Sequence, residues 1–411
     1  MSPAPRPVDV PSPAYRVAFV NTHPIQYFAP LYAYLGAKHR ISVTALYLSD
    51  VSLRGARDAG FGQPVAWDVD LLAGYEARFM GEAARRREVG GFFSMVGPEL
   101  WPAIRRGAFD AVIIHGHNLA AHHVALAAAK TSGTAVFARG DTHLGLHRPR
   151  WRSQARRAVL CAWYRAFDGV LAVGTANALY YRAMGVPPER IHIMPFAVDN
   201  ARFMAGARLA PEERADLRRR LGLKPDLPVV LFAAKFEPRK RPEDLVRAMA
   251  GLQREGIAGQ VLLVGSGETE PDLRALVAQS GIADVVFHGF ANQSALPAIY
   301  GVSDIFVLPA ENEPWGLAVN EAMCAGLAIV ASDEVGCVPD LVETGVTGAT
   351  FRARDLAGLA AALRPLLADA DHRRRCGAHS LARIARWSYR ESADGLMRAL
   401  AAVDRHTGGR G

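Results

Sequence analysis

The sequence has few cysteines and no long apolar run. Its four cysteines (Cys161, Cys324, Cys337 and Cys376) are scattered over 411 residues, and none belongs to a C-x-x-C pair. This pattern predicts reduced core thiols in a cytosolic protein and argues against a disulfide framework or a zinc site. No run of 18 apolar residues occurs, so no membrane-spanning helix is predicted, although the protein could still lie against a membrane. The first fourteen residues are proline-rich without an apolar core, which indicates a disordered start and not a signal peptide.

Composition and hydrophobic rhythm together predict two α/β domains. Half of the residues are hydrophobic, 21% are charged and 8% are aromatic, which is typical of a globular protein and excludes disorder as the main state. Short apolar runs rich in β-branched residues alternate with helical patterns, which predicts parallel sheets buried on both faces. The expected strands are 15–20, 41–48, 111–114, 135–138, 169–173 and 191–194, then 229–233, 260–264, 285–288, 305–309 and 328–331.

A change of pattern near residues 197–209 predicts a hinge between the domains. We expect a disordered terminus over 1–14 and two Rossmann-like domains, over 15–200 and 201–385. Residues 386–411 should form a C-terminal helix, able to pack back on the first domain, and a disordered tail. Open α/β sheets bind ligands at the carboxyl ends of their strands, so the functional residues should face the cleft between the domains.

Positive charge is concentrated in the first half. The chain has 48 Lys and Arg against 40 Asp and Glu, and residues 1–206 hold 23 of the basic but only 14 of the acidic side chains. This asymmetry indicates an anionic partner for the first half or, equally well, drift in an Arg-rich composition.

Segment 147–167 carries an arginine cluster beside a helical pattern. Arg152, Arg156 and Arg157, with Trp151, are suited to anionic headgroups and hence to a lipid-linked acceptor. Nucleic acid is not expected as a partner, because no recognised binding module is visible. One helical stripe is predicted to make core contacts: Ala155, Ala158, Val159, Ala162, Trp163 and Ala166.

The richest constellation lies in residues 309–340. Glu313 and Glu321 stand eight positions apart, a spacing that is weak by itself because such pairs arise by chance. Its context is stronger, since Glu313 follows an expected strand and an Ala/Leu/Met-rich helix is expected over 317–325. A helix N-terminus presents free N–H groups and a positive dipole end. Two carboxylates there are able to hold two parts of one ligand, for example a sugar and a ribose.

The run EPWGLAVNEAMCAGLAIVAS from Glu313, followed by Gly336 and the Pro339-Asp340 loop, resembles a known family. The family is the retaining nucleotide-sugar glycosyltransferases of GT-B architecture with an E-x7-E motif, which includes bacterial mannosyltransferases and sucrose and glycogen synthases. The resemblance covers essentially the whole chain. It implies an α/β fold of two Rossmann-like, doubly wound domains that face a cleft, with the acceptor domain over 15–200 and the nucleotide-sugar donor domain over 201–385.

The resemblance also implies roles for individual residues. Glu313 is expected to contact the donor sugar and Glu321 the nucleotide ribose, while the backbone at Gly316 and Leu317 meets the donor. Loops 264–268 and 286–290 match the nucleotide side of the family. They add three donor-binding candidates: Gly265, Gly267 and Phe290.

A basic patch, FAAKFEPRKRPEDL, begins at Phe232. Lys235 and Lys240 flank a loop that should open a helix at about residue 242, where a diphosphate is expected to be cradled. The family usually has Gly-Arg and Lys-Gly here, so Lys235 stands where arginine is expected and Arg241 where glycine is. The charge is kept, but the bidentate fork of an arginine is lost. The alternative is a solvated basic loop.

Three strand ends of the first half supply the remaining candidates. By the resemblance, His117 contacts the donor sugar; without it, a packed or solvent-facing histidine is the simpler interpretation. The run RGDTH is either an acceptor site or a structural Arg–Asp pair, and the first strand ends in NTHPIQY where many relatives have Gly-Gly. The acceptor-side candidates from these two loops are His23, Gln26, Arg139, Asp141 and His143.

The predicted function is retaining transfer of a sugar from a nucleotide-diphosphate donor to an acceptor hydroxyl, in surface polysaccharide or glycolipid synthesis. His117, Glu313, Lys235 and Lys240 are the predicted catalytic residues, with the lysines stabilising the leaving diphosphate electrostatically. No cofactor is expected, and no metal, because no D-x-D carboxylate pair is evident for one.

The expected partners are a nucleotide sugar, an acceptor glycan or lipid-linked glycan, and an anionic membrane surface. The expected location is the cytoplasm, with peripheral attachment to the inner face of the membrane as an option. Two other functions stay open: a phosphorylase or epimerase on the same fold, and a non-catalytic nucleotide-sugar-binding subunit. The donor sugar, the base and the acceptor do not follow from the sequence.

Overall fold

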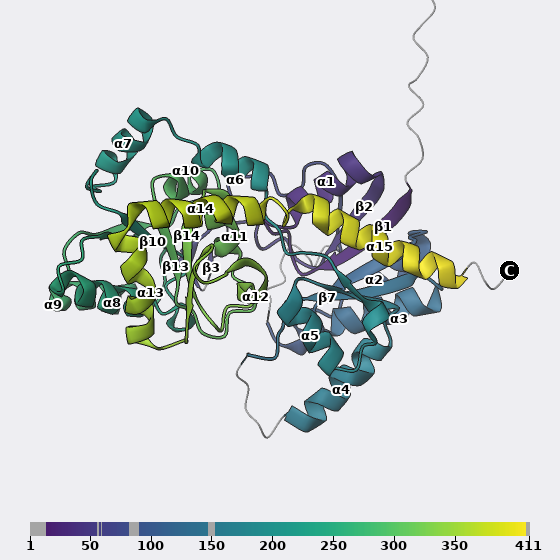
Figure 1. Ribbon diagram of the computed structural model, residues 1–411. Coiled ribbons are helices and arrows are strands. Elements are labelled where there is room, and N and C mark those ends of the chain that lie inside the picture. Colours follow the sequence, from purple (N-terminus) through teal and green to yellow (C-terminus); the bar gives the residue numbers. More distant parts are fainter. Residues whose placement is uncertain (1–13, 56, 59, 82–89, 147–152, 408–411) are drawn as a thin grey trace, which may run out of the picture.

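The computed structural model describes residues 14–407 except 56, 59, 82–89 and 147–152. Within this part of the chain, two α/β domains lie side by side, each built on a parallel sheet with helices on both faces (Figure 1). The predicted architecture is confirmed, and every expected strand coincides with an observed one. Continuous apolar runs form these strands because both faces of each sheet are buried.

The first domain contains a seven-stranded sheet. One face packs on α2, α3, α4 and α5, and the other packs on α1 and on α15 from the C-terminus. Its strands, in spatial order, are β5 (Glu76–Phe79), β2 (Ile41–Tyr47), β1 (Tyr15–Asn21), β6 (Ala111–His115), β7 (Ala135–Gly140), β8 (Gly169–Ala172) and β9 (Ile191–Ile193). Its helices are α1 (Ala29–His39), α2 (Leu100–Arg106), α3 (Ala120–Thr131), α4 (Ser153–Arg165) and α5 (Thr175–Ala183).

The second domain contains a six-stranded sheet. Its strands, in spatial order, are β12 (Val285–Gly289), β11 (Gln260–Val264), β10 (Val229–Ala233), β13 (Ile305–Leu308), β14 (Ala328–Ser332) and β15 (Gly348–Phe351). The helices from the junction onward are α6 (Asn200–Ala207), α7 (Pro211–Arg220), α8 (Pro242–Arg254), α9 (Glu270–Ser280), α10 (Leu296–Gly301), α11 (Leu317–Cys324), α12 (Val338–Leu341), α13 (Leu356–Ala368), α14 (Ala370–Ile384) and α15 (Tyr389–Thr407). Helix α6, inside the predicted hinge, packs on α10 and α11.

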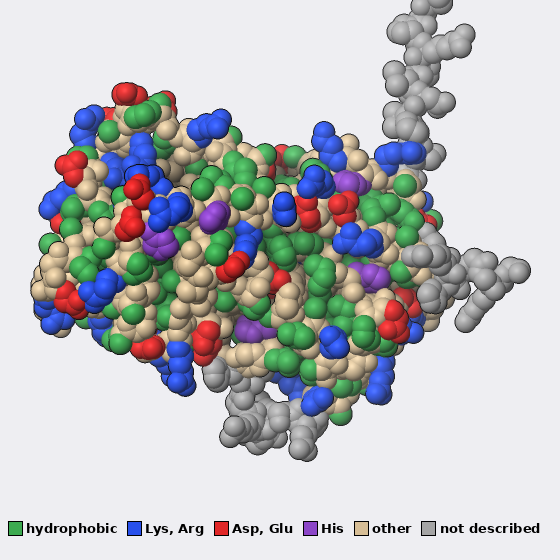
Figure 2. Space-filling model, viewed as in Figure 1, with side chains coloured by type: hydrophobic (Ala, Val, Ile, Leu, Met, Phe, Trp, Pro, Cys, Tyr) green, Lys and Arg blue, Asp and Glu red, His purple; other side chains and the backbone are tan. Residues whose placement is uncertain are grey.

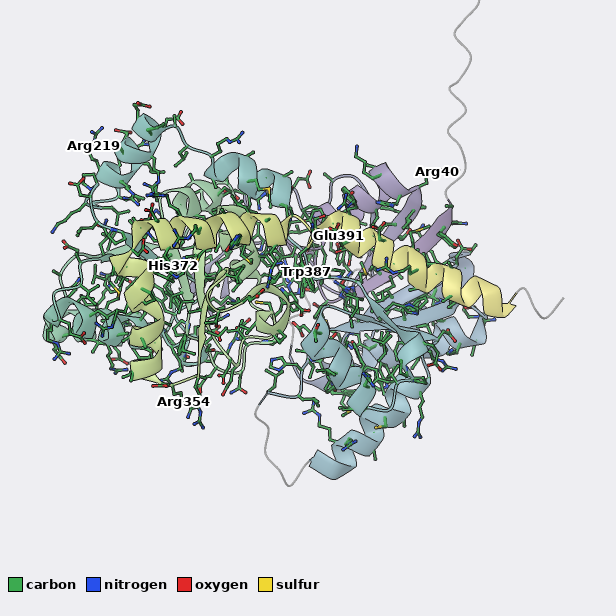
Figure 3. All side chains as sticks on the ribbon, in the orientation of Figure 1. Arg40, Arg219, Arg354, His372, Trp387 and Glu391 are labelled. Carbon is green, nitrogen blue, oxygen red and sulfur yellow. The ribbon has the colours of Figure 1, made fainter. Side chains whose placement is uncertain are left out.

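The C-terminal helices join the two domains. Helix α14 covers the second domain, and α15 crosses to the first, where Ala393 and Leu396 enter its core (Figure 1). Trp387 lies at the crossing, as Figure 3 shows. Its Nε1 donates to the carbonyl of Phe196 at 3.0 Å, and its ring stacks on Trp315 at a centroid distance of 5.7 Å. Helix α15 and Trp387 therefore connect the two domains where the chain crosses between them.

A segment of the first domain, residues 60–68, lies against the second domain, and we call it the strap. It contains β4 (Gln63–Pro64), which pairs antiparallel with β3 (Arg57–Asp58). Asp68 accepts from the backbone N–H of Ser294 at 3.1 Å, and its carboxylate also binds the Ser294 hydroxyl. Asn292 Nδ2 donates to the carbonyl of Ala66 at 2.7 Å. No pattern in the sequence predicts this interdomain contact.

Helix α4 corrects the predicted core stripe. Val159 is 66% exposed, and Ala158 and Ala162 are exposed as well, whereas Leu160 and Trp163 are buried. Of the predicted stripe, Trp163 is buried as expected, but Ala158, Val159 and Ala162 are not, because small alanines fit either face of a helix and the large side chains decide which face is buried. Arg152 and Trp151 lie outside the described residues.

Charge is spread over the surface that faces the viewer in Figure 2, where basic and acidic side chains are interspersed over both domains. In the described part of the chain, each helix is too short or too polar to cross a bilayer.

Candidate functional site

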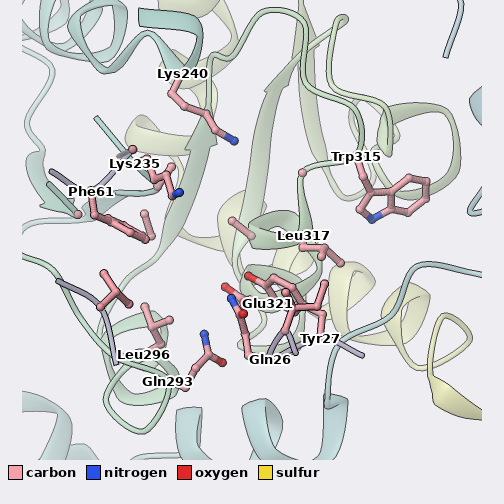
Figure 4. Close-up of a pocket in the computed structure, with 18 of the residues that line it drawn as sticks. Gln26, Tyr27, Phe61, Lys235, Lys240, Gln293, Leu296, Trp315, Leu317 and Glu321 are labelled. Atoms are coloured by element: carbon pink, nitrogen blue, oxygen red, sulfur yellow. The ribbon is translucent and has the colours of Figure 1, made fainter. Parts of the chain in front are cut away.

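The two domains enclose a cavity of about 950 Å³ (Figure 4). The second domain contributes the carboxyl ends of β10, β11 and β13 and the start of α11, and the first contributes the loop after β1 and the strap. This is where open α/β sheets bind ligands. The predicted site residues that line it are His23, Gln26, Asp141, Lys235, Lys240, Gly265, Phe290, Glu313, Gly316, Leu317 and Glu321.

Glu313 lies in the cavity wall and is bound by two cationic side chains. Its side chain is buried, and its Oε2 accepts from Lys240 Nζ at 2.5 Å and from Arg239 Nη1 at 2.7 Å. Burial opposes ionisation, but the two cations outweigh it and lower the pKa of Glu313 below its ordinary value. Arg239 was missed from the sequence, although its place beside Lys240 at the end of the short helix Pro238–Lys240 was a usable signal.

Glu321 lies one turn inside α11. It is 3% exposed, its Oε2 accepts from the Tyr300 hydroxyl at 2.8 Å, and its Oε1 makes no hydrogen bond within the described residues. Burial raises the pKa of Glu321 to about 7, and the hydrogen bond from Tyr300 opposes this rise. Burial, and after it the nearby Glu321 carboxylate, raise the pKa of Tyr27, whose hydroxyl the first domain brings within hydrogen-bonding reach of Glu321. A buried carboxylate oxygen without a partner is suited to accept a ligand hydroxyl.

The start of α11 is open to the cavity because of one glycine. Gly316 precedes the helix with φ +91, a conformation that other residues rarely adopt, and a Cβ there would lie 2.8 Å from the Val335 side chain. Leu317 is the first helical residue and also lines the cavity. The free N–H groups of this helix end therefore lie at the same wall as Lys240.

The two glycines predicted on the donor side, Gly265 and Gly267, lie in different places in the structure. Gly265 lines the cavity, and a Cβ there would lie 2.0 Å from the carbonyl oxygen of Ala234, so only glycine fits. Gly267 lies outside the cavity and instead packs on the strap, where a Cβ would lie 2.8 Å from the carbonyl oxygen of Gly60. The structure thus places Gly267 against the strap, while its donor contact stays a prediction.

His117 lies in a second, smaller cavity of about 340 Å³, which adjoins the first through the shared residue Asp141. Arg139 and Arg156 line it too. Arg139 is 3% exposed and donates through Nη1 to the carbonyl of Met194 at 2.9 Å, while its Nη2 makes no hydrogen bond within the described residues. Burial lowers the pKa of Arg139 to about 10, so it stays charged at neutral pH. His117 and Arg139 therefore belong to a cationic cavity separate from the one that holds Glu313.

His143 lines neither cavity but joins the domains. The backbone N–H of Gly145 donates to its Nδ1 at 3.2 Å, which leaves the proton on Nε2, and Nε2 donates to the carbonyl of Glu313 at 3.0 Å. Nearby, Asp340 accepts from the backbone N–H of Thr175 at 2.9 Å. His143, an acceptor-side candidate by sequence, thus positions the loop that carries Glu313.

Two D-x-D triplets are present after all, Asp68 to Asp70 and Asp369 to Asp371. Asp68 holds the strap, and Asp70 accepts from the backbone N–H of Leu72 at 2.8 Å. Asp369 caps α14 by accepting from the backbone N–H groups of residues 371 and 372. Neither triplet lines a cavity, and the described residues contain no cluster of three potential metal ligands.

Both halves of the chain match glycosyltransferase families. Residues 74–202 match the model of Glycosyltransferase Family 4, and residues 213–382 match that of Glycosyl transferases group 1. A D-inositol 3-phosphate glycosyltransferase of Nocardia farcinica is 36% identical over 53% of this chain and 49% of its own length. An alpha-D-kanosaminyltransferase of Streptomyces kanamyceticus is 31% identical over 47% of this chain and 49% of its own length. The chain thus spans about half the length of these curated relatives.

Solved structures share the fold at low sequence identity. The Anabaena protein HepE in complex with UDP and glucose superposes with a TM-score of 0.70 and 17% identity, over 94% of this chain and 100% of that one. The sucrose-phosphate synthase of Thermosynechococcus elongatus has a TM-score of 0.70 and 20% identity, over 95% of this chain and 100% of that one. The two facing Rossmann-like domains thus have the GT-B architecture, and each half of the chain matches a glycosyltransferase family model.

Proposed function

We propose that the chain transfers a sugar from a nucleoside diphosphate donor to an acceptor hydroxyl, with retention at the anomeric carbon and without a metal. One observation carries the proposal: Glu313, Lys240 and Arg239 meet beside the N-terminus of α11 in the interdomain cavity. Cations and free N–H groups at one wall suit a leaving diphosphate.

Each donor part then has a partner in the cavity. The diphosphate binds Lys235, Lys240 and the start of α11, a ribose hydroxyl donates to the Glu321 carboxylate, and the sugar lies against Glu313. The diphosphate draws Lys240 and Arg239 away from Glu313, which frees that carboxylate for the sugar hydroxyls. Glu313 orients the sugar without attacking it, and the leaving phosphate oxygen takes the proton of the attacking acceptor hydroxyl.

The acceptor is proposed to carry an anionic group. The second cavity has Arg139, Arg156 and His117 in its wall and adjoins the first at Asp141. An acceptor with a phosphate or carboxylate in this cavity would direct a hydroxyl toward the donor. The name of the D-inositol 3-phosphate glycosyltransferase relatives agrees with a phosphorylated acceptor. A glycan or lipid-linked glycan of surface polysaccharide synthesis, met at the inner membrane face, is such a molecule.

Slow donor hydrolysis tests the reaction without knowledge of the acceptor. The chain is incubated in EDTA with UDP-, GDP- and ADP-linked α-sugars, and ¹H NMR records the released sugar before it mutarotates. We expect at least one donor to release the α-anomer first, and Glu313→Gln to abolish the release. Release of the β-anomer would contradict retention. Release that depends on an added divalent metal would contradict the metal-free account.

A further inference from the structure

The strap places two aromatic rings in the cavity opposite the nucleotide-side loop of the second domain. Phe61 and Trp67 line the cavity, as does Phe290, which follows β12. The Phe61 and Phe290 rings meet edge to face with centroids 4.8 Å apart, and the Trp67 ring lies 6.2 Å from Phe290. All three side chains are only partly buried. The cavity therefore has an aromatic end built by both domains.

The backbone of the strap packs closely against Lys235 and Glu237 in the cavity wall. A Cβ at Gly60 would lie 2.5 Å from Lys235 Cδ and 2.3 Å from Glu237 Oε1, so a side chain there would displace Lys235. Lys235 Nζ lies 4.8 Å from the centre of the Phe61 ring, a cation–π distance. Figure 4 shows Phe61 and Lys235 together on one side of the pocket, with Trp315 on the opposite side. The aromatic end is thus adjacent to the phosphate-binding lysine.

Hydrogen bonds hold the strap in this place. Gln63 Nε2 donates to Ser266 Oγ at 3.3 Å, and Ser266 Oγ donates to the carbonyl of Phe61 at 2.9 Å. Ser266 belongs to the same loop as Gly265, which lines the cavity. Together with the Asp68 and Asn292 contacts, these bonds fix the strap at both of its ends.

We propose that the strap is the outer wall of the nucleobase site, with Phe61 and Trp67 contacting a base that lies against Phe290. The inference rests on the proposed function, because it assumes a nucleotide donor. A base has two π-faces and suits an aromatic wall, whereas a sugar needs many hydrogen-bond partners. Beside Lys235, this end of the cavity offers Val65, Leu296 and the three aromatic rings. The base is then held between the domains and not by the second domain alone.

The test compares a nucleotide with its base-free analogue. Calorimetry measures the affinity of UDP, GDP, ADP and inorganic pyrophosphate for the parent chain and for Trp67→Ala and Phe61→Leu. Loss of a base-stacking ring typically weakens binding by roughly five- to a hundredfold. We expect a loss in this range for the nucleotide that binds the parent best, and pyrophosphate affinity within about twofold of the parent. Phe93→Ala is the control, since Phe93 is 78% exposed and lies outside both cavities.

Each other outcome has a definite meaning. Unchanged nucleotide affinity in both variants would overturn the inference and leave the proposed function standing. Equal loss of nucleotide and pyrophosphate affinity would overturn it too, since the strap would then act through the diphosphate wall. A parent chain that binds none of the nucleotides would instead contradict the proposed function, on which the inference depends.

Discussion

The two domains have the same kind of fold but contribute opposite chemistry to the cavity between them. Within the described residues, every lysine and arginine that lines the large cavity comes from the second domain, namely Lys235, Arg239 and Lys240. Yet the first half holds 23 basic against 14 acidic side chains, and residues 207–411 hold 25 against 26. Apart from Asp141 and His23, the first domain contributes aromatic, apolar and neutral polar groups to this cavity, and its own cavity arginines, Arg139 and Arg156, line the small one.

The net charge of either half of the chain is therefore a poor guide to where an anion binds. A few cations at strand and helix ends, in a place shielded from water, are worth more than many on the surface, because solvent and salt screen exposed charges. We therefore assign the donor diphosphate to the nearly neutral domain and an anionic acceptor group to the basic one.

Lys240→Ala should have the largest effect. A charge-assisted contact to a buried phosphate contributes about 1.5–3 kcal/mol, so turnover should fall roughly ten- to a hundredfold. Lys235→Ala should act in the same direction. Steady-state donor hydrolysis measures the change, with Lys224→Ala as control, because Lys224 makes an exposed ion pair with Asp284. Equal effects of Lys240→Ala and the control would contradict the assignment of the diphosphate to this wall.

The two glutamates should separate binding from transfer. Glu321→Ala removes the proposed ribose contact and should weaken nucleoside diphosphate binding about tenfold. Glu313→Gln should reduce transfer much more than nucleoside diphosphate affinity, because its proposed partner is the sugar. Calorimetry and turnover on both variants check this pattern. The reverse pattern, with Glu313 needed for nucleotide and Glu321 only for turnover, would exchange the two roles.

The stability of the folded chain should depend on pH because the Glu321 carboxylate is buried. Its pKa in the folded chain, about 7 against an ordinary 4.5, makes the folded state bind a proton that the unfolded state releases, so stability falls as pH rises from about 4.5 to 7. The difference corresponds to about 3 kcal/mol at pH 8. Glu321→Gln should therefore raise the melting temperature at pH 8 by several degrees and by little at pH 5. A shift of equal size at both pH values would show that ionisation is not its cause.

The smallest effect is expected at a lipid surface. Helix α4 exposes Val159, Arg157 and Arg165, so we expect weak, reversible binding to anionic vesicles. Each arginine near such a surface contributes about 1 kcal/mol, and the attraction fades as the Debye length falls from about 10 Å at 0.1 M salt to about 3 Å at 1 M. Arg157→Gln with Arg165→Gln should reduce co-sedimentation severalfold. Arg219→Gln with Arg220→Gln, on α7 of the second domain, is the matched control, and no preference for anionic over neutral lipid would refute the idea.

The fold and the second-domain wall could be predicted because they depend on local patterns. Strand ends fix where Lys235, Glu313 and Gly316 lie, since every parallel strand delivers its loop to the same edge of the sheet. The strap could not be predicted, because Phe61 and Phe290 meet across 229 positions and no periodic pattern marks such a contact. The position of His117 in the small cavity could not be predicted for a similar reason. A strand end predicts the edge of the sheet, but not which of two neighbouring cavities a side chain enters.

A crystal structure with the best-binding nucleoside diphosphate, grown in EDTA, would show directly whether the donor diphosphate binds in the large cavity. Both cavities carry cations, and only one of them is assigned to the donor. The account predicts diphosphate oxygens on Lys235, Lys240 and the start of α11, with a ribose hydroxyl on Glu321. A diphosphate bound to Arg139 and Arg156 in the small cavity would contradict it.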